Sequence, residues 1–315
     1  MTPLWIVLIC LAALAVLLFV LSHIAMRLVC CGRGRFFSFV ERLMHDAVYA
    51  DLKPWIAEAE VWLREHGAQE VTTTSFDGLS LVGELIPREN ARGTLLLFHG
   101  WHGSPCSDFG CSLPFYYAQG FRIVLVHQRA QGKSGGTYMT FGIRERRDVH
   151  TWVDWHNARF GADEPVILGG LSMGATTVLM ASGTPFPKNV RGVVADCGFT
   201  SPEEIIRAVL RERQLPAWPL LPLIGLQTRL FAGFSLREYS TREAMKSCRL
   251  PLFLAHGEAD TFVPCVMSRQ TFDACTSENK VLFTVPGAAH GRSYLVDREG
   301  YEKALLAFLK KILEQ

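Results

Sequence analysis

The chain lacks any strong excess of charge. Its 315 residues include 32 lysines and arginines and 30 aspartates and glutamates, so the formal net charge is only +2. No basic stripe points to nucleic acid, and no acidic tail points to a disordered arm. Internal repeats and low-complexity tracts are also missing, so a repeat architecture is not expected. The hydrophobic content of 49% suffices for one large domain or two smaller ones.

Cysteine pairs with metal-binding spacing are missing as well. The nine cysteines are scattered along the chain, and none forms a C-x-x-C motif. Because oxidising compartments favour paired cysteines, an odd and scattered set favours reduced thiols in a protein that faces the cytosol. Cys30 and Cys31 adjoin an apolar segment, so acylation of these two cysteines in a eukaryotic host is the alternative.

The beginning of the chain lacks charge altogether. Residues 4–21 contain no charged residue, glycine or proline, and residues 22–26 extend this run to Arg27. Its length matches the roughly 20 residues that cross a bilayer as a helix. A cleaved signal peptide is the alternative, but it needs a basic start, a shorter apolar core and a small-residue cleavage site, which His23 interrupts. The sequence therefore predicts a transmembrane anchor over residues 1–27.

Charge around this segment predicts its orientation. No lysine or arginine precedes it, and the arginines that follow are Arg27, Arg33, Arg35 and Arg42. The positive-inside rule then places the carboxyl side in the cytoplasm of a single-pass protein of the cell membrane. Residues 28–67 are expected to form a helical linker that packs on the domain, with Pro54 as a break or kink. A helix lying along the membrane is the alternative.

From residue 68 onward, strand-like and helix-like segments alternate. Asp77 and Gly78 separate two alternating runs, which predicts a hairpin. Apolar runs separated by helix-length segments then predict an α/β fold, with a mostly parallel central sheet flanked by helices. The predicted strands cover residues 70–75, 79–85, 94–98, 122–126, 165–168, 190–194, 250–255 and 281–285. The predicted helices cover residues 107–119, 143–158, 173–182, 265–275 and 298–313. Ligands bind such sheets at the carboxyl ends of the strands.

One connection is longer than a helical crossover requires. Roughly fifty residues separate the strand that ends near Asp196 from the one that starts near Leu250. Three prolines in residues 215–224 argue against a regular transmembrane helix. We interpret residues 198–248 as a helical cap whose apolar face roofs a pocket, with Trp218 as a candidate substrate-binding residue. A cap that only packs on the domain is the alternative.

The most informative motif is G-x-S-x-G at residues 170–174. It lies between an apolar run and a helix-like segment, so it predicts a strand, a sharp turn and a helix, with Ser172 at the turn. Glycines on both sides let the backbone pass without a Cβ clash, and the hydroxyl projects into a cleft. A serine becomes a nucleophile only with a histidine base, an acid that orients the base, and donors for the oxyanion.

Chain order restricts the partners of Ser172. In the strand–turn–helix version of this chemistry the acid and then the histidine follow the serine. Only His256 and His290 among the ten histidines follow it, and only His290 also follows Asp260. Both Asp260 and His290 come just after predicted strands, so we predict Ser172, Asp260 and His290 as the catalytic triad. Glu258 is the alternative acid, and His256 is expected to be a structural residue of the acid loop.

Two backbone N–H groups are candidates for the oxyanion hole. One belongs to Met173, directly after the nucleophile, and the other to Trp101 in the glycine-containing loop 99–104. His99 is expected to be a structural hydrogen-bonding residue. His102 is a candidate for the pocket entrance, and a solvated loop histidine is an equal alternative.

Two further patterns do not support a site. Residues 132–134 resemble the end of a phosphate loop, but His127 occupies a position where that motif needs glycine, so a turn after a strand is expected. Acidic and histidine residues also gather at positions 148, 150, 154 and 156. Residues two apart face different sides of a helix, so a solvated polar face is expected there rather than a metal site.

Taken together, these segments resemble the alpha/beta-hydrolase superfamily. The resemblance is closest to the bacterial serine-aminopeptidase-like branch, which also contains esterase-like and lysophospholipase-like members. Residues 99–104, 128–134, 170–174, 256–264 and 287–291 carry it, in the right order over roughly residues 68–315. It implies an alpha/beta-hydrolase fold and no metal or organic cofactor. By this resemblance Ser172 is the nucleophile, Asp260 the acid and His290 the base. Gln128 replaces the aspartate of many relatives, at a position outside the triad.

The predicted function is a membrane-anchored serine hydrolase that cleaves carboxylic esters through an acyl-enzyme. The expected partners are a small-molecule or lipid-like acyl substrate and the membrane, and no nucleic acid. Thioesterase, lysophospholipase and aminopeptidase activities are alternatives on the same triad, because the fold does not fix the substrate. The cap lacks an evident acidic cluster for a free amine, which disfavours the peptidase. A non-catalytic binding or scaffold protein is the alternative of another class, and a missing triad residue would be its signature.

Overall fold

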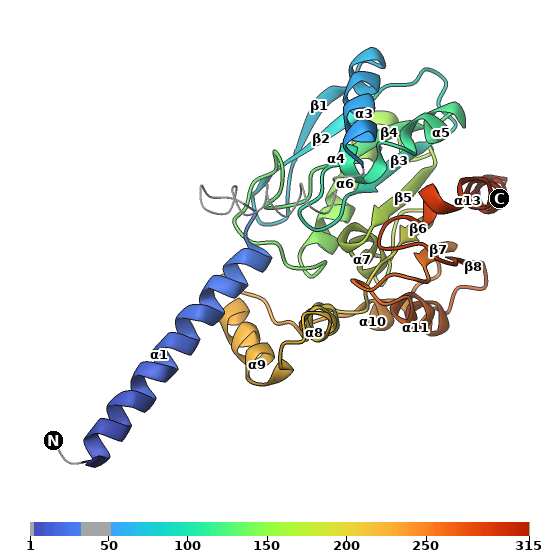
Figure 1. Ribbon diagram of the computed structural model, residues 1–315. Helices are drawn as coiled ribbons and strands as arrows, with labels where there is room; N and C mark the ends of the chain where they lie inside the picture. Colours follow the sequence, from blue (N-terminus) through green and yellow to red (C-terminus); the bar gives the residue numbers. More distant parts are fainter. Residues whose placement is uncertain (1–2, 33–51, 315) are drawn as a thin grey trace.

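The computed structural model describes residues 3–32 and 52–314, and Figure 1 shows their arrangement. Within these residues eight strands form one sheet in the order β1-β2-β4-β3-β5-β6-β7-β8. β2 is antiparallel to β1 and β4, and the other neighbouring strands are parallel. The strands span Gln69–Thr74 (β1), Ser80–Ile86 (β2), Thr94–Phe98 (β3), Arg122–Val126 (β4), Val166–Leu171 (β5), Val190–Asp196 (β6), Leu252–Gly257 (β7) and Lys280–Val285 (β8). The predicted mostly parallel sheet is confirmed.

Helices cover both faces of this sheet, as Figure 1 shows. Their bounds are Pro3–Cys30 (α1), Lys53–Glu65 (α3), Pro105–Phe109 (α4), Leu113–Ala118 (α5), Glu145–Phe160 (α6), Met173–Ala181 (α7), Pro202–Glu212 (α8), Ala217–Gln227 (α9), the π-helical turn Thr228–Ala232 (η2), Thr241–Met245 (α10), Val266–Ala274 (α11), Ser293–Val296 (α12) and Arg298–Leu313 (α13). The predicted helix over residues 107–119 is wrong in one respect, because it is two short helices. Pro114 lies in the first turn of α5, and proline favours a helix start over a helix interior.

The central strand β3 explains why both faces need a cover. Leu95 and Leu97 join a core cluster with side chains of α3, α4, α5 and α13. Leu96 and Phe98 point the opposite way and join a second cluster with side chains of α6, α7 and α10. Alternate residues of a strand face opposite sides, so an uninterrupted apolar run is stable only between two layers of helices.

After residue 32, the linker region is described only from Leu52 onward. The predicted helical linker over residues 28–67 is represented here by α3, which buries Ala59 and Leu63 against the domain. Pro54 lies in the first turn of this helix, where a missing N–H costs nothing. The expected packing on the domain is confirmed for α3, and residues 33–51 of the predicted linker lie outside the described residues.

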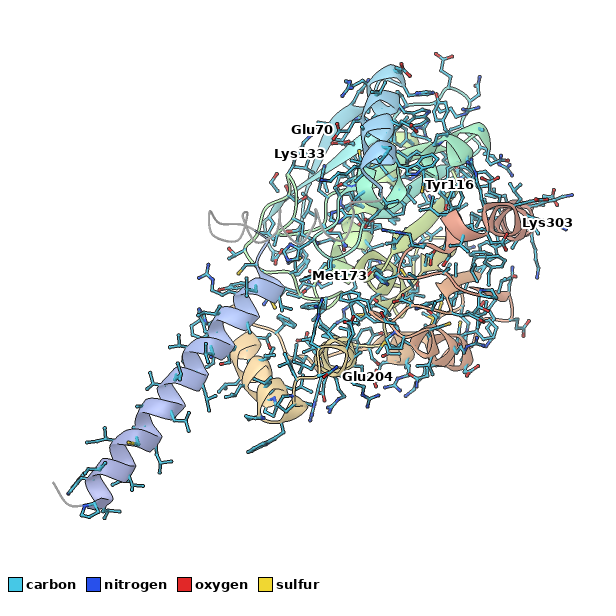
Figure 2. All side chains as sticks on the ribbon, viewed as in Figure 1. Glu70, Tyr116, Lys133, Met173, Glu204 and Lys303 are labelled. Atoms are coloured by element: carbon cyan, nitrogen blue, oxygen red, sulfur yellow. The ribbon has the colours of Figure 1, made fainter. Side chains whose placement is uncertain are left out.

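The first two thirds of α1 lie apart from the domain. Side chains from Leu4 to Leu17 are all exposed, and Figures 1 and 2 show this part of α1 extending into open space. By length and composition α1 qualifies as a membrane-spanning helix, as predicted from the sequence. Ser22, Met26 and Cys30, by contrast, are buried, so α1 joins the domain only through its carboxyl-terminal part.

The cap lies between β6 and β7, where it was predicted, and consists of α8, α9, η2 and α10. Apolar residues of α8, among them Ile205 and Ile206, join Met173 of α7 in one cluster. Leu221 and Ile224 of α9 join Met26 of α1 in the same cluster, and Figure 1 shows α9 beside the carboxyl-terminal half of α1. The cap therefore packs on both α7 and α1.

The expected solvated face on α6 is also wrong at two positions. Asp148 is buried and accepts hydrogen bonds of 2.7 and 2.6 Å from the guanidinium of Arg129, which also binds Asp77 in the hairpin turn. His156 is fully buried, 3.3 Å from a carboxylate oxygen of Glu164. The two residues therefore have separate structural partners.

Candidate active site

Ser172 lies at the sharp turn between β5 and α7. Its φ of 56° and ψ of −114° fall in a region that non-glycine residues rarely adopt, at a cost of about 1–3 kcal/mol. The flanking glycines permit the close backbone approach that the turn needs. A Cβ on Gly170 would lie 2.3 Å from the carbonyl of Gly174, and a Cβ on Gly174 only 1.8 Å from the carbonyl oxygen of Phe98. Backbone packing thus demands the glycines of the motif.

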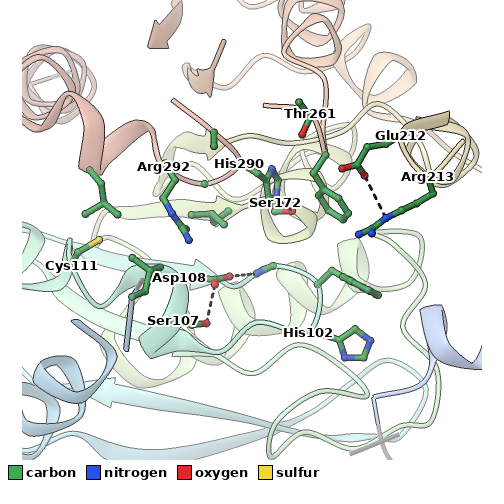
Figure 3. Close-up of a pocket in the computed structure, with 18 residues that line it drawn as sticks. His102, Ser107, Asp108, Cys111, Ser172, Glu212, Arg213, Thr261, His290 and Arg292 are labelled. Atoms are coloured by element: carbon green, nitrogen blue, oxygen red, sulfur yellow. Dashed lines mark hydrogen bonds and ion pairs between the residues drawn. The ribbon is translucent and has the colours of Figure 1, made fainter. Parts of the chain in front are cut away.

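The loops after β7 and β8 bring two side chains to this serine. His290 Nε2 lies 2.9 Å from Ser172 Oγ, and His290 Nδ1 lies 2.7 Å from Asp260 Oδ2. Because an ionised carboxylate can only accept, the imidazole proton belongs on Nδ1, and Nε2 accepts the hydroxyl proton. The three residues predicted from chain order therefore lie in one hydrogen-bonded chain, and Figure 3 shows Ser172 and His290 next to each other.

The Asp260 carboxylate is buried and fully engaged. Its Oδ1 accepts backbone hydrogen bonds from Phe262 and Val263 at 3.0 and 2.8 Å, and its Oδ2 faces His290 and, at 3.2 Å, His256. Burial would raise the pKa of Asp260, but the hydrogen bonds from the two histidines outweigh it and hold the pKa at about 2. The carboxylate is therefore ionised at neutral pH, as an orienting acid must be.

The neighbouring residues of the acid loop do not reach the serine. His256 is fully buried and donates from Nε2 to the carbonyl of Val263 at 2.8 Å, while its Nδ1 lies 2.7 Å from Ser268 Oγ. These contacts shape the loop that holds Asp260. The alternative acid Glu258 instead binds Arg269 and Thr284 at the surface, at 3.1 and 2.8 Å.

Of the two candidate oxyanion donors, Met173 directly follows Ser172, and Trp101 lines the same cavity as Ser172. Met173 is the first residue of α7, so no carbonyl of that helix can accept its N–H. Trp101 follows β3, and among the described residues its backbone N–H has no acceptor. The loop around Trp101 is fixed by its indole N–H, which donates to the Val29 carbonyl at 2.8 Å, and by the His102 N–H, which donates to Gln131 Oε1 at 2.8 Å.

Asp108 also fixes this loop, and the sequence did not reveal it. Its Oδ2 accepts the Gly100 N–H at 2.5 Å, and its Oδ1 accepts the hydroxyl of Ser107 at 2.9 Å. The available signal was the helix start at Ser104-Pro105, an N-cap serine followed by a first-turn proline. That signal places Asp108 in the first turn of α4, directly behind the loop.

His99 and Gln128 support the same loop from behind. Buried His99 donates from Nδ1 to the Gly100 carbonyl at 2.8 Å and accepts the Gln128 N–H at 3.2 Å. Burial lowers the pKa of His99 to about 4, so the ring is neutral. The Gln128 side chain donates to the His99 carbonyl and accepts from Thr177 of α7 at 3.0 Å. An amide can make both bonds, whereas an ionised aspartate cannot donate.

Ser172 and His290 line a cavity of about 490 Å³. Its volume suits a small organic ligand. The apolar part of its wall consists mainly of Trp101, Leu171, Phe262 and Leu295. His102 lines it as expected, and Figure 3 shows the cationic side chains of Arg213 and Arg292 on opposite sides of Ser172.

Trp218 is not part of this cavity. The cap contributes only Glu212 and Arg213 to the described lining. Trp218 lines a separate cavity of about 550 Å³, together with Glu203 and Arg207 of α8 and residues of α9. The structure therefore does not bring Trp218 to the candidate site, because α9 turns toward α1 rather than over the sheet.

Near the site, three side chains carry atoms that can bind a metal ion. Donor atoms of Cys197, Asp260 and His290 lie within 4.8 Å of one another. Burial and the nearby carboxylates of Asp196 and Asp260 raise the pKa of the Cys197 thiol well above its ordinary value, so it is not the thiolate that a metal requires. Both oxygens of Asp260 are already engaged, and these residues do not fit a metal centre.

Comparisons with known proteins agree with this architecture. A family model described as "alpha/beta hydrolase fold" matches residues 93–221. The chain is 24% identical over 233 residues to the uncharacterized protein YqkD of Bacillus subtilis, covering 74% of this chain and 76% of YqkD. It is 24% identical over 247 residues to the uncharacterized membrane protein YNL320W of Saccharomyces cerevisiae, covering 76% and 79%.

A solved structure shows the same fold. The esterase Pf2001 of Pyrococcus furiosus superposes with a TM-score of 0.66 at 24% identity, covering 79% of this chain and 92% of the esterase. The family match and the superposition show that the chain has the alpha/beta-hydrolase fold.

Proposed function

We propose that this protein is a membrane-anchored serine hydrolase that cleaves carboxylic esters with lipophilic acyl groups. The observation that carries the proposal is the continuous hydrogen-bonded chain from Ser172 through His290 to Asp260, which opens into the 490 Å³ cavity. A serine with these two partners has the groups needed for nucleophilic attack on an acyl carbon.

The proposed reaction has two halves. Ser172 Oγ attacks the ester carbonyl while His290 Nε2 accepts its proton, and the N–H groups of Trp101 and Met173 stabilise the oxyanion. One such donor contributes about 2.7–4 kcal/mol to transition-state stabilisation. His290 then protonates the leaving alkoxide, and the acyl group stays on Ser172. Water, deprotonated by His290, releases the acid, while Asp260 holds the imidazole tautomer and stabilises its transient charge.

The cavity wall supports an acyl substrate over a peptide. Trp101, Leu171, Phe262 and Leu295 provide apolar surface beside Ser172. An aminopeptidase needs a carboxylate for the free amine of its substrate, but both carboxylates of the described lining are engaged: Asp108 accepts two hydrogen bonds, and Glu212 lies 3.9 Å from the guanidinium of Arg213. Thioesterase and lysophospholipase activities would use the same residues, so a panel of substrates must separate them.

The anchor completes the proposal. The exposed apolar part of α1 suits a single membrane span, and a yeast relative is itself named as a membrane protein. The arginines after α1 favour a cytoplasmic catalytic domain. Cleavage of the domain by protease added to intact cells would contradict this orientation.

Labelling with a fluorophosphonate tests the nucleophile. Wild-type protein in membranes should be labelled, whereas Ser172→Ala and His290→Ala should not. Hydrolysis of p-nitrophenyl esters of increasing chain length then tests the acyl preference. A well-folded, inserted wild-type protein without labelling or hydrolysis would contradict the proposal and favour a binding or scaffold role.

A further inference from the structure

The cap exposes an unusual concentration of large apolar side chains. Outside α1, the described residues expose eleven such side chains, and five of them come from the short segment 215–231. We call these five the α9–η2 surface: Leu215, Trp218, Leu226, Leu230 and Phe231. Trp218 is 79% exposed and Leu230 is 60% exposed, so neither is explained by packing within the domain. Contiguous exposed apolar side chains mark an interaction site.

The position of this surface along α1 indicates what covers it. Gln227 donates to the Phe19 carbonyl at 3.2 Å and to Ser22 Oγ at 3.1 Å, and its side-chain oxygen accepts from His23. The ring of Phe231 lies 4.5 Å from the ring of His23. The end of α9 and the η2 turn are thus fixed to α1 at the level of residues 19–23.

This level coincides with the end of the apolar run of α1. Residues 4–21 span about 27 Å at 1.5 Å per residue, close to the roughly 30 Å of hydrocarbon in a bilayer. If α1 spans the membrane, as proposed above, residues 19–23 lie at the boundary between hydrocarbon and head groups. Gln227 and Phe231 must then lie at the same boundary, because they contact α1 there.

Charge on the same segment agrees with a lipid partner. Arg211, Arg213 and Arg229 are all exposed. Interfacial helices combine apolar side chains with arginines or lysines, which contact anionic head groups. A protein partner would not have to lie at the depth that α1 imposes, whereas a lipid surface always lies there.

The same segment leads directly to the candidate active site. Arg213 lines the cavity of Ser172, and Leu215 belongs to the α9–η2 surface. Two residues of chain span at most about 7 Å, so the cavity rim lies close to this surface. We infer that the α9–η2 surface inserts into the interfacial layer of the bilayer and brings the cavity to the lipid phase, from which an acyl ester can enter. This inference rests on the proposed function, both for the span of α1 and for the ester substrate.

Lipid photo-cross-linking of the full-length chain tests the contact without using activity. The probe is a phosphatidylcholine with a diazirine near the head-group end of its acyl chain, in vesicles that also contain phosphatidylglycerol. Trypsin cuts after Arg213, Arg229 and Arg237 and so yields peptides of residues 214–229 and 230–237, which contain the α9–η2 surface. The control is residues 304–310 on α13, which carry exposed Leu306. Labelling of the first two peptides should exceed labelling of the control about tenfold. Burial of one large apolar side chain in lipid favours contact with the probe by about that factor.

Paired variants then test delivery of the substrate. Trp218→Ser combined with Leu230→Ser should lower kcat/KM for a long-chain ester in vesicles by at least about tenfold, since the loss of one such side chain already weakens lipid contact by that factor. A water-soluble acetate ester should be cleaved at the wild-type rate. Leu306→Ser is the matched control and should change neither rate.

The outcomes separate this inference from the proposed function. Equal labelling of all three peptides, or cross-links from the surface to a second copy of the chain, would overturn the inference. Release of the protein by alkaline carbonate would show instead that α1 does not span the membrane. Labelling of the surface without any ester hydrolysis would support lipid contact and contradict the catalytic proposal.

Discussion

The serine turn and the α9 region of the cap are held in place by different means. Around Ser172 the backbone segments of β3, β5 and α7 approach so closely that only glycine fits at positions 170 and 174. α9 contains Gly225, where an added Cβ would come no nearer than 3.7 Å to any neighbour, and it exposes Trp218 almost completely. The difference shows that the serine turn is fixed by steric contact inside the domain. The α9 region, by contrast, is positioned against α1 and leaves apolar side chains exposed.

The strongest test of the rigid region removes Ser172, the proposed nucleophile. Ser172→Ala should lower kcat for an ester substrate by about 10⁴- to 10⁶-fold, because residues of a triad act as a unit. Steady-state hydrolysis by protein in vesicles measures the loss, and Ser247→Ala on the surface serves as the control. The double variant with His290→Ala should be no less active than Ser172→Ala alone. A further loss in the double variant would show that the two residues do not act together.

The acid provides a second test of the same region. Asp260→Asn should lower kcat about 10⁴-fold, because an amide no longer holds His290 in the tautomer that accepts from Ser172. Glu258→Gln in the same loop is the matched control and should retain activity, since Glu258 binds Arg269 and Thr284 instead. The reverse result would identify Glu258 as the functional acid.

Steric contact at the turn predicts a large effect on stability. Gly174→Ala would place a Cβ 1.8 Å from the Phe98 carbonyl oxygen, so the backbone must move. We expect the free energy of unfolding to fall by about 3 kcal/mol or more, because the obstacle is backbone and cannot rotate away. Urea denaturation of the detergent-solubilised protein measures it. Unchanged stability would mean that the turn is less tightly packed than the contacts indicate.

Acid should weaken the rigid region through Asp260. Its pKa is about 2 in the folded protein against an ordinary value of 3.8, so folding favours the ionised form. This contributes about 2 kcal/mol above pH 5, which is lost as the pH falls from about 4 to 2. Urea denaturation at pH 6, 4 and 3 measures the loss, and it should be smaller in Asp260→Asn. An equal acid dependence in both proteins would assign the effect to other carboxylates.

The difference between the serine turn and the α9 region also explains which parts of the fold can be predicted from the sequence. β3 and β4 have the predicted bounds to the residue, because each consists of one polar residue followed by an uninterrupted run of four apolar residues. Ser172, Asp260 and His290 follow from chain order, since strands deliver their carboxyl ends to one edge of the sheet. These features depend on local pattern and on topology, and both can be predicted from a single sequence.

The wrong predictions share a different cause. α9 is apolar whether it covers a pocket or packs on α1, so its composition alone could not place Trp218. Likewise, the polar pattern of α6 gave no sign that Asp148 is buried, because its partner Arg129 lies on another element. In both cases the deciding contact is made by a segment distant in the chain, and no local signal identifies it.

The smallest expected effect sharpens the contrast between the two regions. Gly225→Ala in α9 adds a methyl group where the nearest neighbour, a Leu236 side-chain carbon, lies at 3.7 Å, an ordinary van der Waals contact. Alanine also has the higher helix propensity, so the free energy of unfolding should rise by about 0.5–1 kcal/mol. The same urea denaturation measures it beside Gly174→Ala, which should shift in the opposite direction. A destabilised Gly225→Ala would mean that α9 is packed as tightly as the serine turn, and the contrast between the two regions would fail.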